Sequence, residues 1–207
     1  MELIMTGMHD ADPKRRRRAL EKATSIGKRI CHAPASSRRP PGRMEGETER
    51  MRSAVSSIIM RDVDPGVRQY AMETLVSLSH VGDVSCVQLA IKMLDDSNSP
   101  MRERAVQALS MVARPGDAHV IEALISRLDE DGKQRNMMRH ACSARETNSV
   151  RVAMVRALGV LTEGKWEARI VAQLAEIGEY DADPVVREAA RNVILSLGKE
   201  SLFQELL

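Results

Sequence analysis

The chain has 207 residues, of which 43% are hydrophobic and only 2% aromatic. Its apolar surface is therefore mostly small and aliphatic, which favours helices and disfavours a β-sandwich or β-barrel. Because 31 basic side chains nearly balance 29 acidic ones, giving a formal net charge of +2, no chain-wide field attracts nucleic acid or anionic lipid. Any electrostatic partner must bind locally.

The cysteines and the N-terminal sequence indicate the compartment. Three cysteines without a CxxC motif, Cys31, Cys86 and Cys142, encode neither a disulfide framework nor a zinc knuckle, which fits a reducing environment. The N-terminus lacks a basic region followed by a long apolar run, and no segment approaches the roughly 20 apolar residues that a membrane helix needs. The sequence predicts a cytoplasmic protein, with the nucleus as the alternative, and no membrane partner.

Five similar segments each begin with an arginine that is followed by a small or apolar residue three positions later and an apolar residue seven positions later. This spacing places the apolar residues on one helix face, so each segment is predicted to form the first helix of a repeat. Their separations indicate a unit of about 35 residues with two insertions. The five arginines are Arg16, Arg68, Arg102, Arg151 and Arg187.

An aspartate directly before a proline marks the start of three of these helices. The aspartate can cap free N–H groups, and the proline already has a φ close to the helical value. These pairs are Asp12-Pro13, Asp64-Pro65 and Asp183-Pro184.

The second helix of a repeat is clearest where Gly82-Asp83 recurs as Gly116-Asp117, because apolar residues follow both pairs at i, i+4 and i+7 spacing. Second helices are expected at about 49–60, 84–94, 118–128 and 166–177, and from 200 to the end. Two insertions separate the helices. The segment 33–47 is predicted to be a disordered basic loop within the first repeat, and 131–149 a loop between the third and fourth repeats.

An aspartate lies six residues before the arginine in four of the five repeats. If the repeats stack, each arginine is expected to bridge its own aspartate and that of a neighbour, which would form a structural ladder in the seam between repeats. In the fourth repeat Arg145 precedes Arg151 by six residues, so the ladder is expected to be broken or paired differently there. The four aspartates are Asp10, Asp62, Asp96 and Asp181.

The paired helices, the repeat length and the Asp/Arg offset resemble HEAT repeats, a family of α-solenoids, and especially their shorter lyase-like members. The resemblance covers nearly the whole chain and implies a single all-α array over residues 1–207, with about five stacked helical hairpins in an armadillo-like superhelix. It also assigns the second helices to the inner surface. The residues expected to contact a partner there are Gln88, Lys92, Glu122 and Ser126.

No catalytic, metal or cofactor site is predicted. The five histidines form no HExxH pair, and the chain lacks the repeated His-Glu dipeptides of HEAT-like iron hydroxylases. His140 and Cys142 provide two ligands in a loop, which do not close a tetrahedral metal site.

A basic N-terminal patch has two interpretations. It could be a solvated helix face, or it could bind a nucleic-acid backbone, an import receptor or an acidic protein tail. No aromatic stacking platform supports nucleic-acid binding. The patch comprises Lys14, Arg15, Arg17, Arg18, Arg38, Arg39 and Arg43.

These patterns favour a noncatalytic scaffold, adaptor or regulatory subunit that binds another protein, because a helical stack offers an extended surface for many modest contacts. Apolar residues near both ends, such as Leu202 and Phe203, also indicate end-to-end stacking or continuation of a longer array. Two alternatives remain. One is a nucleic-acid-associated HEAT protein that uses the basic patch, and the other is a chaperone-like subunit resembling phycobilin lyases.

Overall fold

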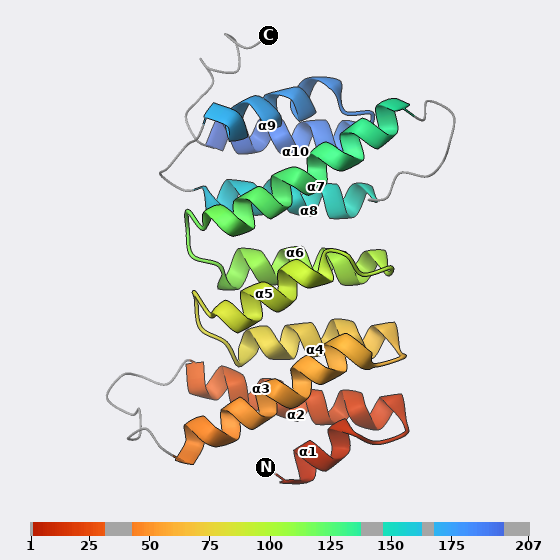
Figure 1. Cartoon of the computed structure of the whole chain (residues 1–207), viewed down its shortest axis with the longest axis vertical. Helices are drawn as coiled ribbons and strands as arrows, with labels where there is room; N and C mark the ends of the chain where they lie inside the picture. The colour runs from red at the N-terminus through yellow and green to blue at the C-terminus, as the bar shows by residue number, and fades with distance from the viewer. Residues whose placement is uncertain (1, 32–42, 138–146, 163–167, 197–207) are drawn as a thin grey trace. The chain divides into compact units, whose positions relative to one another are not determined.

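The structure is a computed structural model that describes residues 2–31, 43–137, 147–162 and 168–196 (Figure 1). Within these ranges the chain forms α-helices and no β-strand, so the predicted all-α class is confirmed. The helices divide into two compact units, Met1–Val112 and Ala113–Leu207.

In the first unit, the first helices of successive repeats lie side by side, with α4 between α2 and α6 (Figure 1). The second helix α3 packs against α4, α5 packs against α6, and the short α1 packs against α2. The helices are α1 (Glu2–Met8), α2 (Pro13–Cys31), α3 (Arg43–Arg61), α4 (Pro65–Ser77), α5 (Val84–Met93) and α6 (Ser99–Val112).

In the second unit, α10 packs against both α8 and α9, and α7 packs against α8. The same alternation of first and second helices therefore continues within this unit. Its helices are α7 (Ala118–Met137), α8 (Asn148–Leu161), α9 (Ala168–Tyr180) and α10 (Pro184–Ser196).

Two helices extend into segments that the sequence assigned to loops. Helix α3 begins at Arg43, so residues 43–47 are helical, and α7 continues to Met137, so residues 131–137 are helical as well. The Arg, Glu, Lys and Gln residues in these segments have good helix propensity, whereas the apolar pattern that predicts the helices ends earlier. The second predicted loop also overlaps α8, which begins at Asn148. Residues 33–42 and 138–146 of the predicted loops, Trp166 and the predicted helix from residue 200 lie outside the described residues.

The recurring Gly-Asp pair ties a repeat to the next one within each unit. Gly82 and Gly116 have φ values of 84° and 79°, a conformation that glycine adopts without steric cost. The N–H of Gly82 donates to the carbonyl of Val112 at 2.6 Å, and that of Gly116 donates to the carbonyl of Leu161 at 2.6 Å. The glycine thus satisfies a carbonyl at the end of the next first helix.

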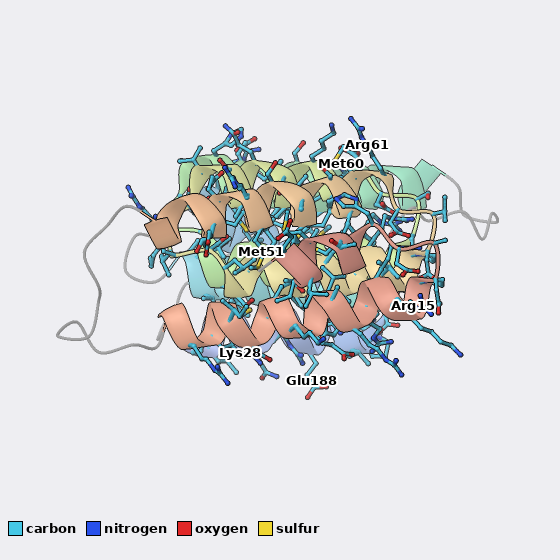
Figure 2. All side chains as sticks on the ribbon, turned by 90° about the horizontal axis from the view of Figure 1, so that it is seen from below. Arg15, Lys28, Met51, Met60, Arg61 and Glu188 are labelled. Carbon is cyan, nitrogen blue, oxygen red and sulfur yellow. The ribbon has the colours of Figure 1, made fainter. Side chains whose placement is uncertain are left out.

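Aliphatic and methionine side chains fill the core, as the composition predicts. Figure 2 shows Met51 inside the molecule and Met60 and Arg61 at its outer surface. Cys86 is fully buried in the first unit, and this burial raises the pKa of its thiol. The helices therefore leave mainly polar side chains available for a functional surface.

Candidate functional site

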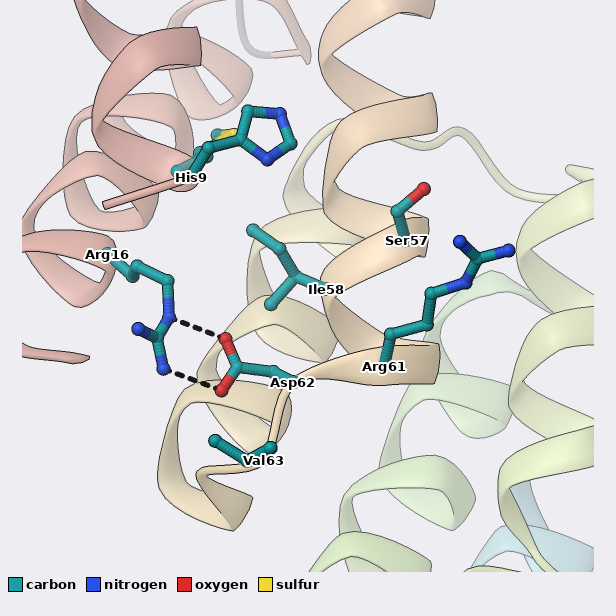
Figure 3. Close-up of a pocket in the computed structure, with 8 residues that line it drawn as sticks. His9, Arg16, Ser57, Ile58, Arg61, Asp62 and Val63 are labelled. Atoms are coloured by element: carbon teal, nitrogen blue, oxygen red, sulfur yellow. Dashed lines mark hydrogen bonds and ion pairs between the residues drawn. The ribbon is translucent and has the colours of Figure 1, made fainter. Parts of the chain in front are cut away.

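The loop before α4 shows how the Asp/Arg ladder is built (Figure 3). The carboxylate of Asp62 accepts a hydrogen bond from the N–H of Asp64 at 2.9 Å. It also accepts two from Arg16 of the preceding first helix, Nε to Oδ2 at 2.6 Å and Nη2 to Oδ1 at 2.8 Å. The carbonyl of Asp62 instead accepts from Nη1 of Arg68 in its own repeat, at 3.0 Å.

The ladder therefore has a direction. Arg16 and Arg68 each donate to the backbone carbonyl of the aspartate in their own repeat and to the carboxylate of the aspartate in the following repeat, whereas the sequence had suggested a bridge between two equivalent side chains. Arg68 repeats the pattern with Asp96, whose Oδ1 lies 3.1 Å from Nη2 of Arg68, and whose carbonyl accepts from Arg102 at 2.9 Å. A bidentate or carbonyl-anchored guanidinium fixes the angle between helices better than an apolar contact does.

The second unit contains the same arrangement. Arg151 forms an ion pair with the carboxylate of Asp181, and Nη1 of Arg187 donates to the carbonyl of Asp181 at 2.6 Å. Arg151 thus enters the ladder although Arg145, which lies outside the described residues, stands where the aspartate of its own repeat is expected.

The ladder is part of the packing between helices. The side chains of Asp62 and Asp181 are 5% and 2% exposed, and hydrogen bonding to Asp62 raises the pKa of Arg16 above its ordinary value. These arginine and aspartate side chains pair with each other between the packed helices, so their charges are not available to bind a ligand.

A pocket of about 470 Å³ lies next to the first rung, between α1 and the end of α3 (Figure 3). Apolar side chains of Met8, Ile58 and Val63 line it together with His9 and Arg61. Val63 is 90% exposed, and the two basic side chains are also exposed. An apolar body that carries an anionic group would match this lining.

A second groove, of about 430 Å³, crosses the first-helix face of the same unit. Lys28 of α2 and Arg104 of α6 lie at its sides. Arg104 already binds Glu73 of α4 at 2.8 Å. Because Arg104 is already paired, the groove offers less unpaired positive charge than its lining residues suggest.

The predicted basic patch is only partly brought together. Arg15 binds Asp10 at 3.3 Å, while Arg17 binds Glu21 at 3.7 Å and lies over the ring of Tyr70, 5.2 Å from its centroid. Lys14 and Arg18 are exposed on α2. Arg38 and Arg39 lie outside the described residues, as does the side chain of Arg43.

The residues predicted for partner contact lie on the second helices of the two units and are exposed: Gln88 and Lys92 on α5, Glu122 and Ser126 on α7. Glu122 forms an ion pair with Arg169 of α9, with distances of 2.9 and 3.3 Å.

A further link between second helices was not predicted from the sequence. Arg52 of α3 forms an ion pair with Asp83 at the start of α5. Asp83 also caps α5 by accepting from the N–H of Cys86 at 3.0 Å. The recurring Gly-Asp pair signals the cap, but no comparable repeat identifies Arg52 as its partner.

Across the residues that the structure describes, no three His, Cys, Asp or Glu side chains converge in a way that could hold a metal ion. In the same ranges, every helix is too short or too polar to span a bilayer.

The helix pairs, the ladder and the Gly-Asp turns agree with the comparison to known families. Residues 53–137 match the family model for HEAT repeats. This segment consists of HEAT repeats. The matched segment runs from within α3 to the end of α7. This match confirms the resemblance inferred from the sequence.

One solved structure supports the fold class over almost the entire chain. It is described as the complex of CpcE and CpcF of phycocyanin lyase from Nostoc sp. PCC7120, and it matches with a TM-score of 0.63 at 20% sequence identity. The match covers 99% of this chain and 67% of that chain. No curated protein matches the sequence. The predicted α-solenoid fold is therefore confirmed.

Proposed function

We propose that this HEAT repeat chain is a noncatalytic module that binds another protein through its second helices. One observation carries the proposal. Gln88 and Lys92 are exposed on α5, and among the described residues their side chains form no hydrogen bond or ion pair. Polar side chains that are aligned on a rigid helix and are not used internally suit the recognition of a partner surface.

The structural neighbour is consistent with this function, since it is a complex of two components, CpcE and CpcF. Its sequence identity of 20% supports the shared fold, and the partner of the present chain is inferred from the exposed residues of α5 and α7 alone. Contacts of this kind are individually weak and gain strength when several act along one surface.

Exchanging the charges at Lys92 and Glu122 tests the proposal. The double variant Lys92→Glu/Glu122→Lys is expected to lose a stoichiometric partner that the tagged full chain retains during co-purification from native extract, with mass spectrometry as the readout. Its net charge is unchanged, so a loss reports the position of the charges.

The matched control is Arg114→Glu/Glu188→Arg, which exchanges charges at two exposed positions outside α5 and α7. Capture that survives the first exchange, or that falls equally in both variants, would contradict the proposed surface.

A second candidate function, that of a chaperone-like subunit resembling phycobilin lyases, is favoured by the near-complete coverage of the chain in the structural match. The pocket beside the first ladder rung would be the binding site, because an open-chain tetrapyrrole combines an apolar body with carboxylates. The apolar Val63 and the cation Arg61 line this pocket.

This second function predicts that the purified chain retains the visible absorbance of a bilin after desalting, and that Arg61→Glu reduces the retained absorbance severalfold. Arg114→Glu is the control for the change in charge. A colourless protein after incubation would rule out this function while leaving protein binding intact.

A further inference from the structure

Four exposed cations form a row on α2. Lys14, Arg18 and Lys22 follow one another at intervals of four residues, and Arg29 lies two turns further on. A helix rises about 1.5 Å per residue, so successive charges in the first three are about 6 Å apart. Among the described residues, none of these four side chains forms a hydrogen bond or an ion pair. Figure 2 shows Arg15 and Lys28 pointing outward from the same helix.

This row occupies positions that receive a neighbouring helix elsewhere in the fold. On α4, the residues two and six positions after the ladder arginine are Tyr70, which lies beneath Arg17 of α2, and Thr74, whose hydroxyl oxygen is 2.9 Å from that of Thr24 on α2. The equivalent positions on α2 are Arg18 and Lys22.

The second unit uses the same position in the same way. On α10, Val193 stands six residues after its ladder arginine and packs so closely on α8 that a Cβ added to Gly159 would lie 2.9 Å from Val193 Cγ1. The geometry of the repeat thus makes this part of a first helix a docking position for another helix. On α2 this position, the α2 seat, is cationic and consists of Lys14, Arg18, Lys22 and Arg29.

The start of α2 also exposes one end of the ladder. Asp10 has the same turn as the other aspartates, since its Oδ1 accepts from the N–H of Asp12 at 2.9 Å and its carbonyl accepts from Arg16 at 2.9 Å. Among the described residues, however, the guanidinium that binds its carboxylate comes from Arg15 of the same turn and not from a preceding helix, and the Asp10 side chain is 27% exposed. Asp62, which binds an arginine from a preceding helix, is 5% exposed.

We propose that this face of α2 binds an acidic helix of a partner protein. Carboxylates at i, i+4 spacing on such a helix have the same interval as Lys14, Arg18 and Lys22, and an arginine near its start could join Asp10. Tyr70 is half-buried beneath Arg17, so this ring offers bases little stacking surface and a nucleic acid fits less well. The inference rests on the proposed protein-binding function but uses a different surface.

Fluorescence anisotropy with designed peptides tests the seat. The probe is a stapled, alanine-based helix of about 20 residues with glutamates at i, i+4, i+8 and i+12. The comparison peptide has the same composition, but its glutamates are distributed around the helix. A single-stranded oligothymidine tests the alternative that this face binds a nucleic acid. The patterned helix is expected to bind the full chain about tenfold more tightly than the distributed one, with affinity falling as salt increases.

Arg18→Glu/Lys22→Glu is expected to weaken binding of the patterned helix at least tenfold. Arg114→Glu/Arg156→Glu, which changes the net charge equally at two exposed positions, should bind like the original chain. Equal affinity for both peptides, tighter binding of the oligonucleotide, or equal loss in both variants would overturn the proposal. Lys92→Glu/Glu122→Lys should still bind the patterned helix, so failure of the α5/α7 surface and failure of the α2 seat are separate outcomes.

Discussion

Replacing Asp62 with alanine is expected to reduce the free energy of unfolding by about 3 kcal/mol. The Asp62 side chain is 5% exposed and its partner Arg16 is 11% exposed, so the variant leaves a guanidinium largely desolvated without its carboxylate. The N–H of Asp64 also loses its acceptor. Leaving one partner of a buried ion pair unpaired costs much more than losing the interaction between two solvated charges.

The same substitution at Asp10 is a matched control. Asp10 lies in an equivalent turn and accepts from the N–H of Asp12, but its carboxylate is 27% exposed and binds the exposed Arg15 at 3.3 Å. Asp10→Ala is therefore expected to reduce the free energy of unfolding much less than Asp62→Ala does. Urea unfolding followed by circular dichroism compares the two variants, and equal losses would show that the turn, not the rung, supplies the stability.

The sequence predicted the existence of the ladder but not its direction. The six-residue offset shows that Asp62 and Arg68 belong to one repeat, and the recurrence shows that repeats superpose. Only the backbone conformation decides which oxygen faces which guanidinium. In the structure the turn directs the carbonyl of Asp62 to Arg68 and its carboxylate to Arg16. The spacing of these residues in the sequence does not predict this assignment.

The helix starts marked by an Asp-Pro pair were predicted better than the end of α7, for a physical reason. Asp64 accepts from the N–H of Val67 at 2.9 Å, so the capping residue and the proline after it specify the start of α4 locally. The end of α7 has no such signal, because the apolar pattern ceases near Leu128 while the helix continues to Met137. Helix propensity varies too little among polar residues to locate an end.

The candidate surfaces follow the same distinction. Periodicity correctly placed Gln88, Lys92, Glu122 and Ser126 on exposed helix faces, since exposure depends on the local period. Periodicity could not reveal that Arg169 binds Glu122, because that contact joins residues that are 47 positions apart in the sequence. Of the cationic row on α2, the sequence had assigned Lys14 and Arg18 to the basic patch. The interpretation of the row as a helix seat required the contacts of Thr74 and Val193 with their preceding helices.

Replacing Gly27 with alanine is expected to destabilise the chain by about 1–3 kcal/mol, although alanine usually stabilises a helix relative to glycine by about 0.5–1 kcal/mol. A Cβ at Gly27 of α2 would lie 2.5 Å from the carbonyl oxygen of Ser77 at the end of α4. The obstacle is backbone, so the two helices must separate and expose the aliphatic residues between them.

Two other helical glycines turn this expectation into a graded series. Gly46→Ala meets no atom within 4 Å and should show the ordinary gain from helix propensity. Gly159→Ala would approach Val193 Cγ1 at 2.9 Å, but a side chain can rotate away, so its effect should lie between the other two. Urea unfolding measures all three free energies. If Gly27→Ala were as stable as Gly46→Ala, the close approach of α2 and α4 would be wrong, and with it the spacing of first helices on which the α2 seat depends.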